Sequence, residues 1–276
     1  MGINEHDEAL IDLYARKDES TRLARREGRV ELLRTRALLR QRLEPAQRIL
    51  DVGGADGVHA SWLIDDGHEV EIVDLVPLHV ERARRKGLRA RTGDGRQLPF
   101  DDASFDVVLL LGPLYHLTTA EDRARCLAEA QRVLRDDGLL AAAAVSRLSV
   151  ALDHIRKGRF DDAGFRSAAR RIVDSGRDDT GYGAGLFYFH TPSELHDELA
   201  AAAFGRVEVH GVEGPAWPLI DVDATADDPL VAQVLEIAEM ADGEPAAVAA
   251  SAHLLAFGRR GSARPPQPGV GDPPTS

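Results

Sequence analysis

The sequence predicts an α/β fold built on a mostly parallel sheet of seven strands, with helices at the N-terminus and an inserted cap. Three observations support this prediction. Short apolar runs typical of strands alternate with helical segments from residue 45 to residue 146. A glycine-rich turn, residues 53–57, follows the first of these runs. An apolar run at residues 105–111, interrupted only by Asp106, is typical of a strand that is buried on both faces.

Helical periodicity marks the N-terminal segment and the connections between strands. Apolar residues recur near a 3.6-residue period over residues 5–43, and the polar stretch 17–21 together with Gly28 indicates a break into two helices. The expected strands are residues 48–52, 69–73, 88–92, 105–111, 139–145, 206–210 and 252–258. Helices are expected at residues 58–66, from Pro77 onward, and at residues 120–135, 192–202 and 228–241. We expect Asp136, Asp137 and Gly138 to stop the helix of residues 120–135.

The expected organisation has five parts. Residues 1–44 form a helical lid, residues 45–146 a ligand-binding core, residues 147–190 a cap, and residues 191–260 the rest of the core with an inserted helix. Gly181, Gly183 and Gly185 would permit hinge motion of the cap. Residues 261–276 are rich in proline and glycine and are expected to be a disordered tail.

Composition and charge exclude several classes of function. The chain has 276 residues, 43% of them hydrophobic, and a formal net charge of −12 at pH 7. A surface this acidic repels phosphate backbones, so no nucleic-acid partner is expected. The sole cysteine, Cys126, excludes an internal disulfide and a thiolate metal cluster, and no metal is expected. Because no apolar stretch of spanning length and no secretory signal is visible, we expect a cytoplasmic monomer or homodimer without membrane contact.

The glycine-rich turn after the first strand is the strongest ligand-binding signal. Gly53, Gly54 and Gly57 let the backbone approach a ligand and leave the amino end of the next helix able to donate N–H groups. Their spacing departs from the Gly-x-Gly-x-x-Gly pattern of dinucleotide-binding turns, which disfavours NAD or FAD. Asp51, just before the turn, would repel a pyrophosphate but can accept hydrogen bonds from a ligand's ammonium group.

Two further acidic residues follow the second and third strands. Asp74 ends the second strand, where a carboxylate can accept hydrogen bonds from the two hydroxyls of a ribose. It can equally cap the helix that begins at Pro77. Asp94, before Gly95, can accept from an adenine amino group, although an Asp-Gly pair by itself indicates only a turn. Taken together with the glycine-rich turn, these acids predict a nucleoside-binding edge.

In this order the motifs resemble those of class I S-adenosylmethionine-dependent methyltransferases. The resemblance runs from the Asp51-x-Gly53-x-x-x-Gly57 turn through residues 105–111 and the Gly-Pro-Leu-Tyr-His-Leu segment of residues 112–117, and it covers residues 45–146. It implies a Rossmann-like fold, S-adenosylmethionine as cofactor, and methyl transfer to an oxygen, nitrogen or carbon atom of a small molecule. One departure is Ala55, where the common turn has glycine; we expect alanine there to need a negative φ.

The resemblance also implies contacts to the cofactor, position by position. Asp51, Gly53, Gly54 and Gly57 would hold the methionine part, Asp74 and Leu75 the ribose, Asp94 and Gly95 the adenine, and Leu111 and Gly112 the region of the ammonium group. Tyr14 and Arg22, in the N-terminal helices, are expected as lids, with Arg22 binding the cofactor carboxylate. The alternative for Arg22 is an ordinary surface arginine.

Candidates for catalysis follow the central strand and end the cap. Methyl transfer from a sulfonium is an in-line displacement, so alignment and exclusion of water supply much of the rate, and a base is needed only if the nucleophile must lose a proton. Tyr115 and His116 lie at the expected carboxyl edge of the sheet, and His190 ends an aromatic stretch. Their alternatives are structural: packing for Tyr115, a helix cap for His116, and a packed strand of the cap for His190.

Two rival functions of the same fold stay open. An RNA methyltransferase is disfavoured by the net charge of −12 and by the lack of a basic, aromatic face. A non-catalytic nucleoside-binding module is disfavoured by the intact turn and both carboxylates. The aromatic residues of segment 182–189 and Trp217 point to an aromatic or indole-bearing secondary metabolite as the methyl acceptor.

Overall fold

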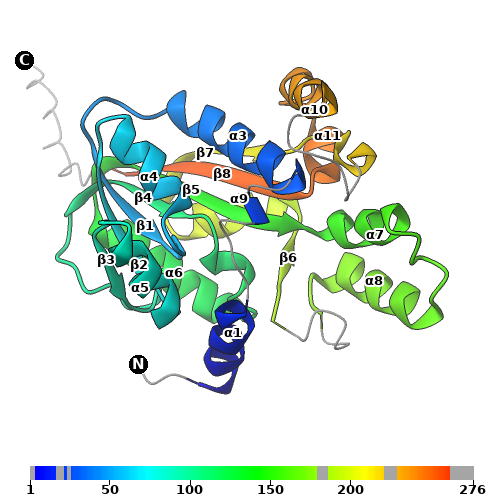
Figure 1. Cartoon of the computed structure of the whole chain (residues 1–276), viewed down its shortest axis with the longest axis horizontal. Helices are drawn as coiled ribbons and strands as arrows, with labels where there is room; N and C mark the ends of the chain where they lie inside the picture. The colour runs from blue at the N-terminus through cyan, green and yellow to red at the C-terminus, as the bar shows by residue number, and fades with distance from the viewer. Residues whose placement is uncertain (1–3, 17–21, 24–25, 179–185, 221–228, 262–276) are drawn as a thin grey trace, which may run out of the picture.

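The structure is a computed structural model, and it describes residues 4–16, 22–23, 26–178, 186–220 and 229–261. At its centre is a sheet in which the described residues form eight strands (Figure 1). The strands are β1 Arg48–Val52, β2 Glu69–Asp74, β3 Ala90–Thr92, β4 Phe105–Leu110, β5 Leu134–Ser146, β6 Phe189–His190, β7 Phe204–Gly211 and β8 His253–Arg260. Their order across the sheet is β3-β2-β1-β4-β5-β8-β7, with β6 beside β5.

Strands β1 to β5 run parallel, and β8 reverses the direction. β1 pairs in parallel with β2 and β4, and β4 pairs in parallel with β5. β8 pairs antiparallel with both β5 and β7. The carboxyl ends of β1, β4 and β5 therefore meet the amino end of β8 at one edge of the sheet. The predicted mostly parallel, Rossmann-like sheet is confirmed.

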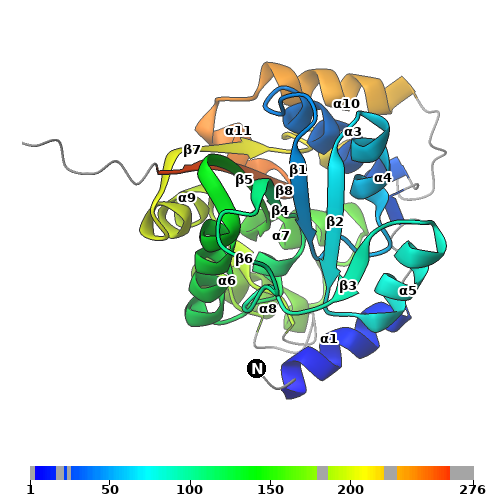
Figure 2. The ribbon, with the colours of Figure 1, turned by 90° about the vertical axis from the view of Figure 1, so that its left-hand side faces the viewer.

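Helices cover both faces of this sheet (Figure 2). They are α1 Glu5–Ala15, α3 Arg26–Arg40, α4 Val58–Asp65, α5 Pro77–Arg85, α6 Ala120–Val133, α7 Arg147–Arg156, α8 Ala163–Ser175, α9 Pro192–Ala201, α10 Pro229–Met240 and α11 Pro245–Ala250, with short 3₁₀ helices η1 Pro113–Tyr115 and η2 Trp217–Leu219. On one face, Leu38 of α3 and Leu63 of α4 pack against the strands. On the other face, Leu127 of α6 and Leu195 of α9 do so.

The sheet has one strand more than the seven predicted. β6 pairs with Val145 and Ser146 of β5, and two residues are too few for a periodic pattern to reveal a strand. Among the described residues, α1 ends at Ala15 and α3 begins at Arg26, and Gly28 lies inside α3 and marks no break. A side chain at Gly28 would stand 2.4 Å from the backbone oxygen of Arg22, so glycine permits close packing there.

The end of α6 also differs from the prediction. The helix expected for residues 120–135 ends at Val133, and β5 begins at the next residue, so the Asp-Asp-Gly sequence lies within the strand. Phe105 pairs with Leu134, whereas Val107 pairs with Leu139, so the intervening residues of β5 bulge out of the ladder. This sequence therefore marks a bulge, where Asp137 has a φ of 60°, and not the stop of a helix.

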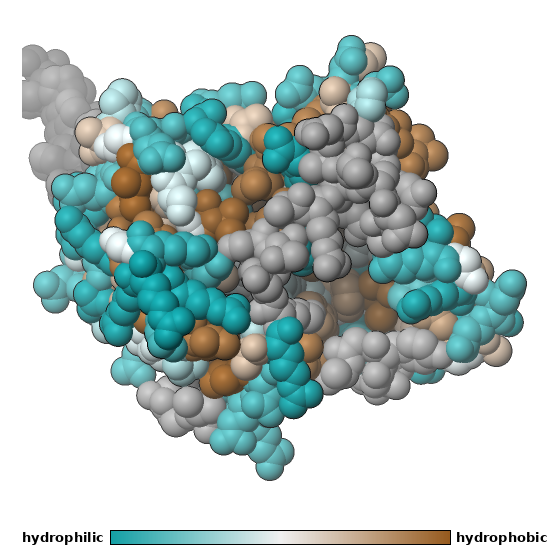
Figure 3. Space-filling model, viewed as in Figure 1, coloured by the Kyte–Doolittle hydropathy of each residue, from teal (hydrophilic) through white to brown (hydrophobic). Residues whose placement is uncertain are grey.

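Two helical segments flank the carboxyl edge of the sheet. α1 lies beside α5 (Figure 2), and the ring of Tyr14 in α1 is 5.9 Å from that of His79 in α5. α7 and α8 form a hairpin that projects from the end of β5 (Figure 1). Hydrophobic residues show at the surface of the molecule (Figure 3). Ile155 of α7 and Met240 of α10 are exposed large hydrophobic residues. Within the described ranges, the helices are too short or too polar to cross a membrane. The predicted hinge glycines 181, 183 and 185 and the predicted tail from residue 262 onward lie outside the described residues.

Candidate functional site

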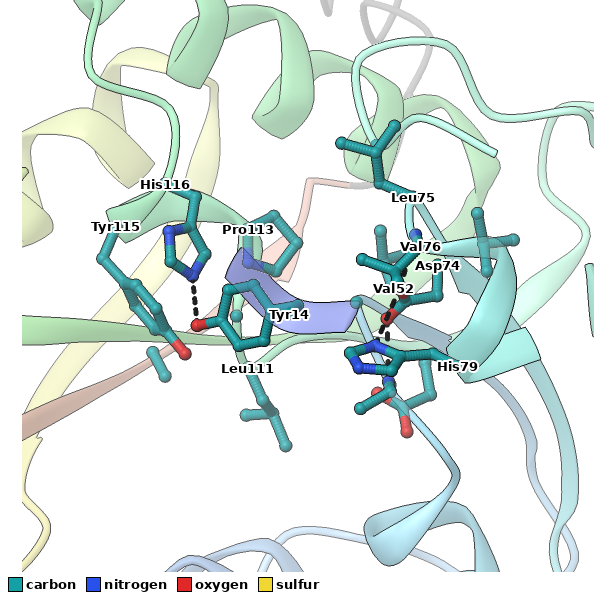
Figure 4. Close-up of a pocket in the computed structure, with 18 of the residues that line it drawn as sticks. Tyr14, Val52, Asp74, Leu75, Val76, His79, Leu111, Pro113, Tyr115 and His116 are labelled. Atoms are coloured by element: carbon teal, nitrogen blue, oxygen red, sulfur yellow. Dashed lines mark hydrogen bonds and ion pairs between the residues drawn. The ribbon is translucent and has the colours of Figure 1, made fainter. Parts of the chain in front are cut away.

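A cavity of about 170 Å³, called here the first cavity, opens at the carboxyl edge of the sheet (Figure 4). Its wall contains most of the predicted site residues: Tyr14, Arg22, Asp51, Gly53, Gly54, Asp74, Leu75, Asp94, Gly95, Leu111, Gly112, Tyr115 and His116. Gly57 and His190 are not part of this wall. The fold thus gathers residues from the N-terminal helices and from the turns after β1, β2, β3 and β4.

The turn between β1 and α4 brings the backbone close to the first cavity. Gly53 and Gly57 have φ angles of 73° and 89°, in a region that glycine adopts without strain. Gly57 also caps the amino end of α4, so it shapes the turn from behind the cavity wall. A side chain at Gly54 would stand 2.5 Å from a carboxylate oxygen of Asp51, which leaves room for glycine alone.

Asp51 is a buried carboxylate in the wall of the first cavity. It is 1% exposed, and among the described residues neither of its oxygens has a hydrogen-bond partner. Burial, and then the negative charge of Asp74, raise the pKa of Asp51 to about 7. A buried carboxylate without donors destabilises the protein until a ligand supplies them. The site therefore fits a ligand that carries an ammonium group.

Asp74, at the end of β2, is oriented by backbone groups. One of its oxygens accepts from the N–H of Ala55 at 2.9 Å and the other from the N–H of Val76 at 2.8 Å. Nδ1 of His79 lies 3.3 Å from the second oxygen (Figure 4). Burial lowers the pKa of His79, but the hydrogen bond to Asp74 and its charge outweigh burial and raise it above the ordinary value. The oxygen of Asp74 that accepts from Ala55 keeps lone-pair capacity for a ribose hydroxyl.

Ala55 corrects one expectation from the sequence. Its φ is 49°, in the left-handed region, and not negative. This conformation costs an alanine roughly 1–2 kcal/mol. The hydrogen bond from the Ala55 N–H to Asp74 offsets part of that cost, since it exists only when the turn folds back onto the end of β2. The turn therefore keeps its shape without the glycine that is common there.

Asp94, after β3, is shared with an arginine that the sequence analysis did not single out. Nε and Nη2 of Arg96 lie 2.9 and 2.7 Å from one oxygen of Asp94. Nη2 of Arg96 also donates to Asp7 of α1 at 2.7 Å, and the side chains of both Arg96 and Asp7 are almost fully buried. This ion pair ties α1 to the turn after β3. The sequence held no sign of it, because Asp7 and Arg96 are far apart in the chain.

Tyr14 and His116 form a hydrogen-bonded pair across the first cavity (Figure 4). The Tyr14 hydroxyl lies 2.7 Å from Nε2 of His116, and Nδ1 of His116 lies 3.2 Å from the carbonyl oxygen of Leu186. Because a carbonyl only accepts, Nδ1 carries the proton, and Nε2 then accepts from the tyrosine hydroxyl. The Tyr115 ring is 4.6 Å from the His116 ring, centre to centre. His116 is thus fixed in one tautomer.

The structure does not bring His190 to the first cavity. Its side chain is fully buried, and Nε2 lies 3.3 Å from a carboxylate oxygen of Glu198 on α9. Arg123 of α6 donates to the same carboxylate, and the Tyr188 ring packs edge-on against His190 at 4.7 Å. Its burial in this cluster, outside the wall of the first cavity, favours the structural alternative, and the role of His190 as a catalytic base stays a prediction.

Arg22 reaches the wall of the first cavity paired with Glu31 of α3. Nη1 and Nη2 of Arg22 donate to the two oxygens of Glu31 at 2.7 and 2.9 Å. Burial raises the pKa of Glu31, but His253 and Arg22 outweigh it and lower this pKa to about 2. The predicted contact of Arg22 with a cofactor carboxylate stays a prediction, since the guanidinium already holds a carboxylate of the protein.

His253, at the start of β8, is a wall residue that the sequence analysis missed. Its Nδ1 lies 2.5 Å from Oε1 of the buried Glu213. Although burial lowers the pKa of His253, the charges of Glu213 and Glu31 raise it to about 9. Possible ligand atoms of Glu31, Glu213 and His253 lie within 4.8 Å of one another. Because Arg22 and the His253 imidazolium already balance both carboxylates, we assign no metal to this cluster.

Comparison with known families identifies part of the chain. Residues 50–142 match the family described as a methyltransferase domain. The matched segment runs from β1 into β5 and contains the glycine-rich turn, Asp74 and Asp94. The family assignment therefore rests on the same residues that build one side of the first cavity.

Individual proteins extend this likeness. The chain is 34% identical over 181 residues to a malonyl-[acyl-carrier protein] O-methyltransferase of Geobacter sulfurreducens. The aligned segment covers 62% of this chain and 60% of the relative. It is 29% identical over 182 residues to a ubiquinone/menaquinone biosynthesis C-methyltransferase of Azotobacter vinelandii, 60% of this chain and 69% of the relative. The match thus spans less than two thirds of the first relative. A solved SAM-dependent methyltransferase from Thermotoga maritima shares the fold, with a TM-score of 0.56, 21% identity, and coverage of 92% of this chain and 98% of the other.

Proposed function

Because residues 50–142 form a class I S-adenosylmethionine-dependent methyltransferase domain, we propose that the chain binds this cofactor and transfers its methyl group to a small molecule. Asp51 carries the proposal: a buried carboxylate, with neither oxygen hydrogen-bonded among the described residues, lies in the wall of the first cavity. The amino-acid part of the cofactor supplies the ammonium group that this carboxylate needs. Asp74, at the end of the neighbouring strand, supplies the acceptor for a ribose.

The remaining contacts follow the order of the turns along the edge. Gly53, Gly54 and Gly57 shape the turn against which the methionine part lies, and Leu75 lies beside the ribose. Asp94 and Gly95 face the adenine, with the Asp94 carboxylate shared between the adenine amino group and Arg96. Leu111 and Gly112 offer backbone groups near the ammonium. The cofactor sulfonium supplies an electrophilic methyl group at this edge of the sheet.

The protein's contribution to the reaction is alignment and exclusion of water. Leu10, Tyr14 and Leu23 close the first cavity from the N-terminal helices. Tyr115 and His116 stay the candidates to contact the acceptor, since both lie in the wall after β4. Because Nε2 of His116 accepts from Tyr14, a proton leaving the acceptor would pass through the Tyr14 hydroxyl and not directly to the imidazole.

A small-molecule acceptor suits the charge of the chain better than RNA does. The net charge of −12 opposes binding of a polyanion. The names of the two relatives place the methyl group on oxygen in one and on carbon in the other, so the acceptor atom does not carry over. We place the protein in the cytoplasm as a monomer or homodimer, in keeping with its composition.

Titration calorimetry with S-adenosylhomocysteine and with NAD tests the proposed function. We expect saturable binding of S-adenosylhomocysteine at one site per chain, and no measurable binding of NAD at the same concentrations. NAD carries a pyrophosphate, which Asp51 repels. Binding of NAD in preference to S-adenosylhomocysteine, or of neither, would overturn the proposal.

A further inference from the structure

A second cavity, of about 320 Å³, adjoins the first. It lies among α7, η2 and the amino end of β8, so it is built from the inserted hairpin and the C-terminal part of the chain. The two cavities have three wall residues in common: Arg22, Glu31 and His253. The Arg22–Glu31 ion pair and His253 therefore form the partition between them.

Strand register connects Leu111, which the proposed function places near the cofactor's ammonium group, with this partition. Leu110 pairs with Ala142, so the next residues, Leu111 and Ala143, lie side by side at the carboxyl edge. Val145 pairs with His253 on the next strand. Leu111 and Ala143 pack against the same core cluster as α3, so a path on that face leads from Leu111 past Ala143 to His253. Ala143 pairs with Leu255, and His253 lies two residues further along β8. Two strand spacings of about 10 Å in all and about 7 Å along β8 give a path of about 12 Å, a length that a small molecule can bridge.

The wall of the second cavity combines an apolar surface with basic groups. Its apolar part consists of Val145, Val150, Phe189, Trp217 and Ile220. Its charged part beyond the partition consists of Asp153, Arg156, Lys157 and Glu213. The Arg156 guanidinium lies 5.6 Å from the centre of the Trp217 ring.

The charges of this wall leave an excess of positive charge. Asp153 accepts from Arg156 at 2.5 Å and from Lys157 at 2.6 Å, so one carboxylate faces two cations. In the partition, Arg22 balances Glu31, and the His253 imidazolium balances Glu213. An excess of one positive charge stands out in a chain of net charge −12. Such a cavity attracts an anion, and the flat face of Trp217 favours an aromatic body.

We propose that the second cavity holds the methyl acceptor, and that the acceptor is an acidic small molecule with a flat apolar body, such as an aromatic carboxylate. This inference rests on the proposed function. The body lies against Trp217 and Val150, the acidic group lies near Arg156 and Lys157, and the nucleophilic end passes the partition towards Leu111. On transfer, the nucleophile forms a bond to the methyl carbon while the carbon–sulfur bond breaks and its electron pair stays on sulfur.

The experiment uses Trp217 as its reporter. The chain has two tryptophans, and Trp62 lies outside both cavity walls, so Trp62→Phe leaves one emitting residue in the second cavity. This variant is titrated with 4-hydroxybenzoate and with 4-hydroxybenzamide, both with and without S-adenosylhomocysteine. We expect a saturable change of Trp217 emission with the benzoate, and binding of the uncharged benzamide that is weaker by at least about tenfold.

Two further substitutions, each with a matched control, locate the probe. Val150→Phe fills the second cavity and should abolish benzoate binding, whereas Val173→Phe, on the exposed side of α8, should leave it unchanged. Lys157→Gln should weaken benzoate binding severalfold, whereas Arg166→Gln removes an equal charge from α8 without effect. Affinity for S-adenosylhomocysteine, measured by calorimetry, should stay the same in all four variants.

The outcomes separate this inference from the proposed function. Equal binding of benzoate and benzamide, no saturable binding of benzoate, or unchanged binding in Val150→Phe overturns the acceptor assignment. If S-adenosylhomocysteine binds normally in those cases, the proposed function stands. If S-adenosylhomocysteine fails to bind the wild type, the proposed function fails, whatever the benzoate does.

Discussion

The two cavities that meet at His253 are built in different ways. The cofactor side of the first cavity comes from turns at the ends of successive parallel strands, where β1, β2 and β4 deliver residues to one edge. The second cavity comes from side chains of α3, α7, η2 and β8, which are distant in the sequence. The residues of the first site are therefore set by short local motifs that the sheet topology brings to one edge. The residues of the second site are set by the tertiary packing of variable segments. Cofactor chemistry should be robust to changes in those segments, and acceptor choice should not.

Among the substitutions that test this contrast between the cavities, Gly53→Val is expected to have the largest effect on cofactor binding. Gly53 has a φ of 73°, and a side chain there would stand 3.0 Å from the Pro113 ring, so valine both strains the turn and fills the cofactor side. We expect S-adenosylhomocysteine binding to be lost in calorimetry. Gly67→Val is the matched control, because Gly67 has a φ of 93° and open space around it. If both variants lose stability but only Gly53→Val loses binding, close approach at Gly53 is the cause; normal binding in Gly53→Val would place the cofactor elsewhere.

Asp74→Ala should weaken cofactor binding strongly, although less than Gly53→Val does. Loss of charge-assisted hydrogen bonds to the ribose costs roughly 1.5–3 kcal/mol, so the dissociation constant for S-adenosylhomocysteine should rise at least about tenfold. Asp101→Ala, which removes an exposed carboxylate after β3, serves as the control and should bind normally. Wild-type affinity in Asp74→Ala would refute the ribose assignment.

The sequence predicted the cofactor side well because its signals are local. Asp51 and Asp74 lie at the carboxyl ends of β1 and β2, and Asp94 follows β3, so parallel strands carry all three to a common edge. The sequence could not reveal the Asp7–Arg96 or Glu213–His253 pairs, since each joins distant segments by packing alone.

For His190 the sequence signal was weaker. Its place after an aromatic stretch suggested a contact with the methyl acceptor, whereas pairing of β6 with β5 buries its side chain beside Glu198. Periodicity could not show this, because a two-residue strand has no period. Ala55 failed for a related reason: a hydrogen bond to a residue on another strand decides its φ.

A smaller effect is expected at α1, part of the predicted lid of residues 1–44. Three contacts tie α1 to the wall of the first cavity: the Asp7–Arg96 ion pair, the Tyr14–His116 hydrogen bond, and a hydrogen bond of 2.7 Å from Nε2 of His6 to the carbonyl oxygen of His116. We therefore expect amide hydrogen exchange in α1 to slow when S-adenosylhomocysteine is added. Tyr14→Phe removes a bond worth about 1 kcal/mol and should speed exchange in α1 about fivefold, with α9 as the internal reference. If the rate of amide hydrogen exchange in α1 changes neither on addition of the ligand nor in Tyr14→Phe, the lid assignment is refuted.

The central claim, that Asp51 receives the cofactor's ammonium group, is tested most directly by the pH dependence of binding. The pKa of Asp51 in the free protein is raised to about 7, so the side chain is neutral below that pH and charged above it. An ammonium ligand prefers the charged form, so affinity should rise with pH up to about 7 and then level off. The same shift makes Asp51 stabilise the ligand-free protein at low pH and lose that contribution as pH rises through 7.

The measurement is calorimetric titration of wild type and Asp51→Asn with S-adenosylhomocysteine between pH 5.5 and 7.5, about two units over which the ligand's amine stays mostly protonated. In the wild type, we predict a loss of affinity approaching about tenfold per pH unit below 7. In Asp51→Asn, binding should be weaker and nearly independent of pH, while the ligand-free variant melts at a higher temperature than the wild type at pH 7.5. The same pH profile in both proteins, or undiminished affinity in Asp51→Asn, would contradict the account.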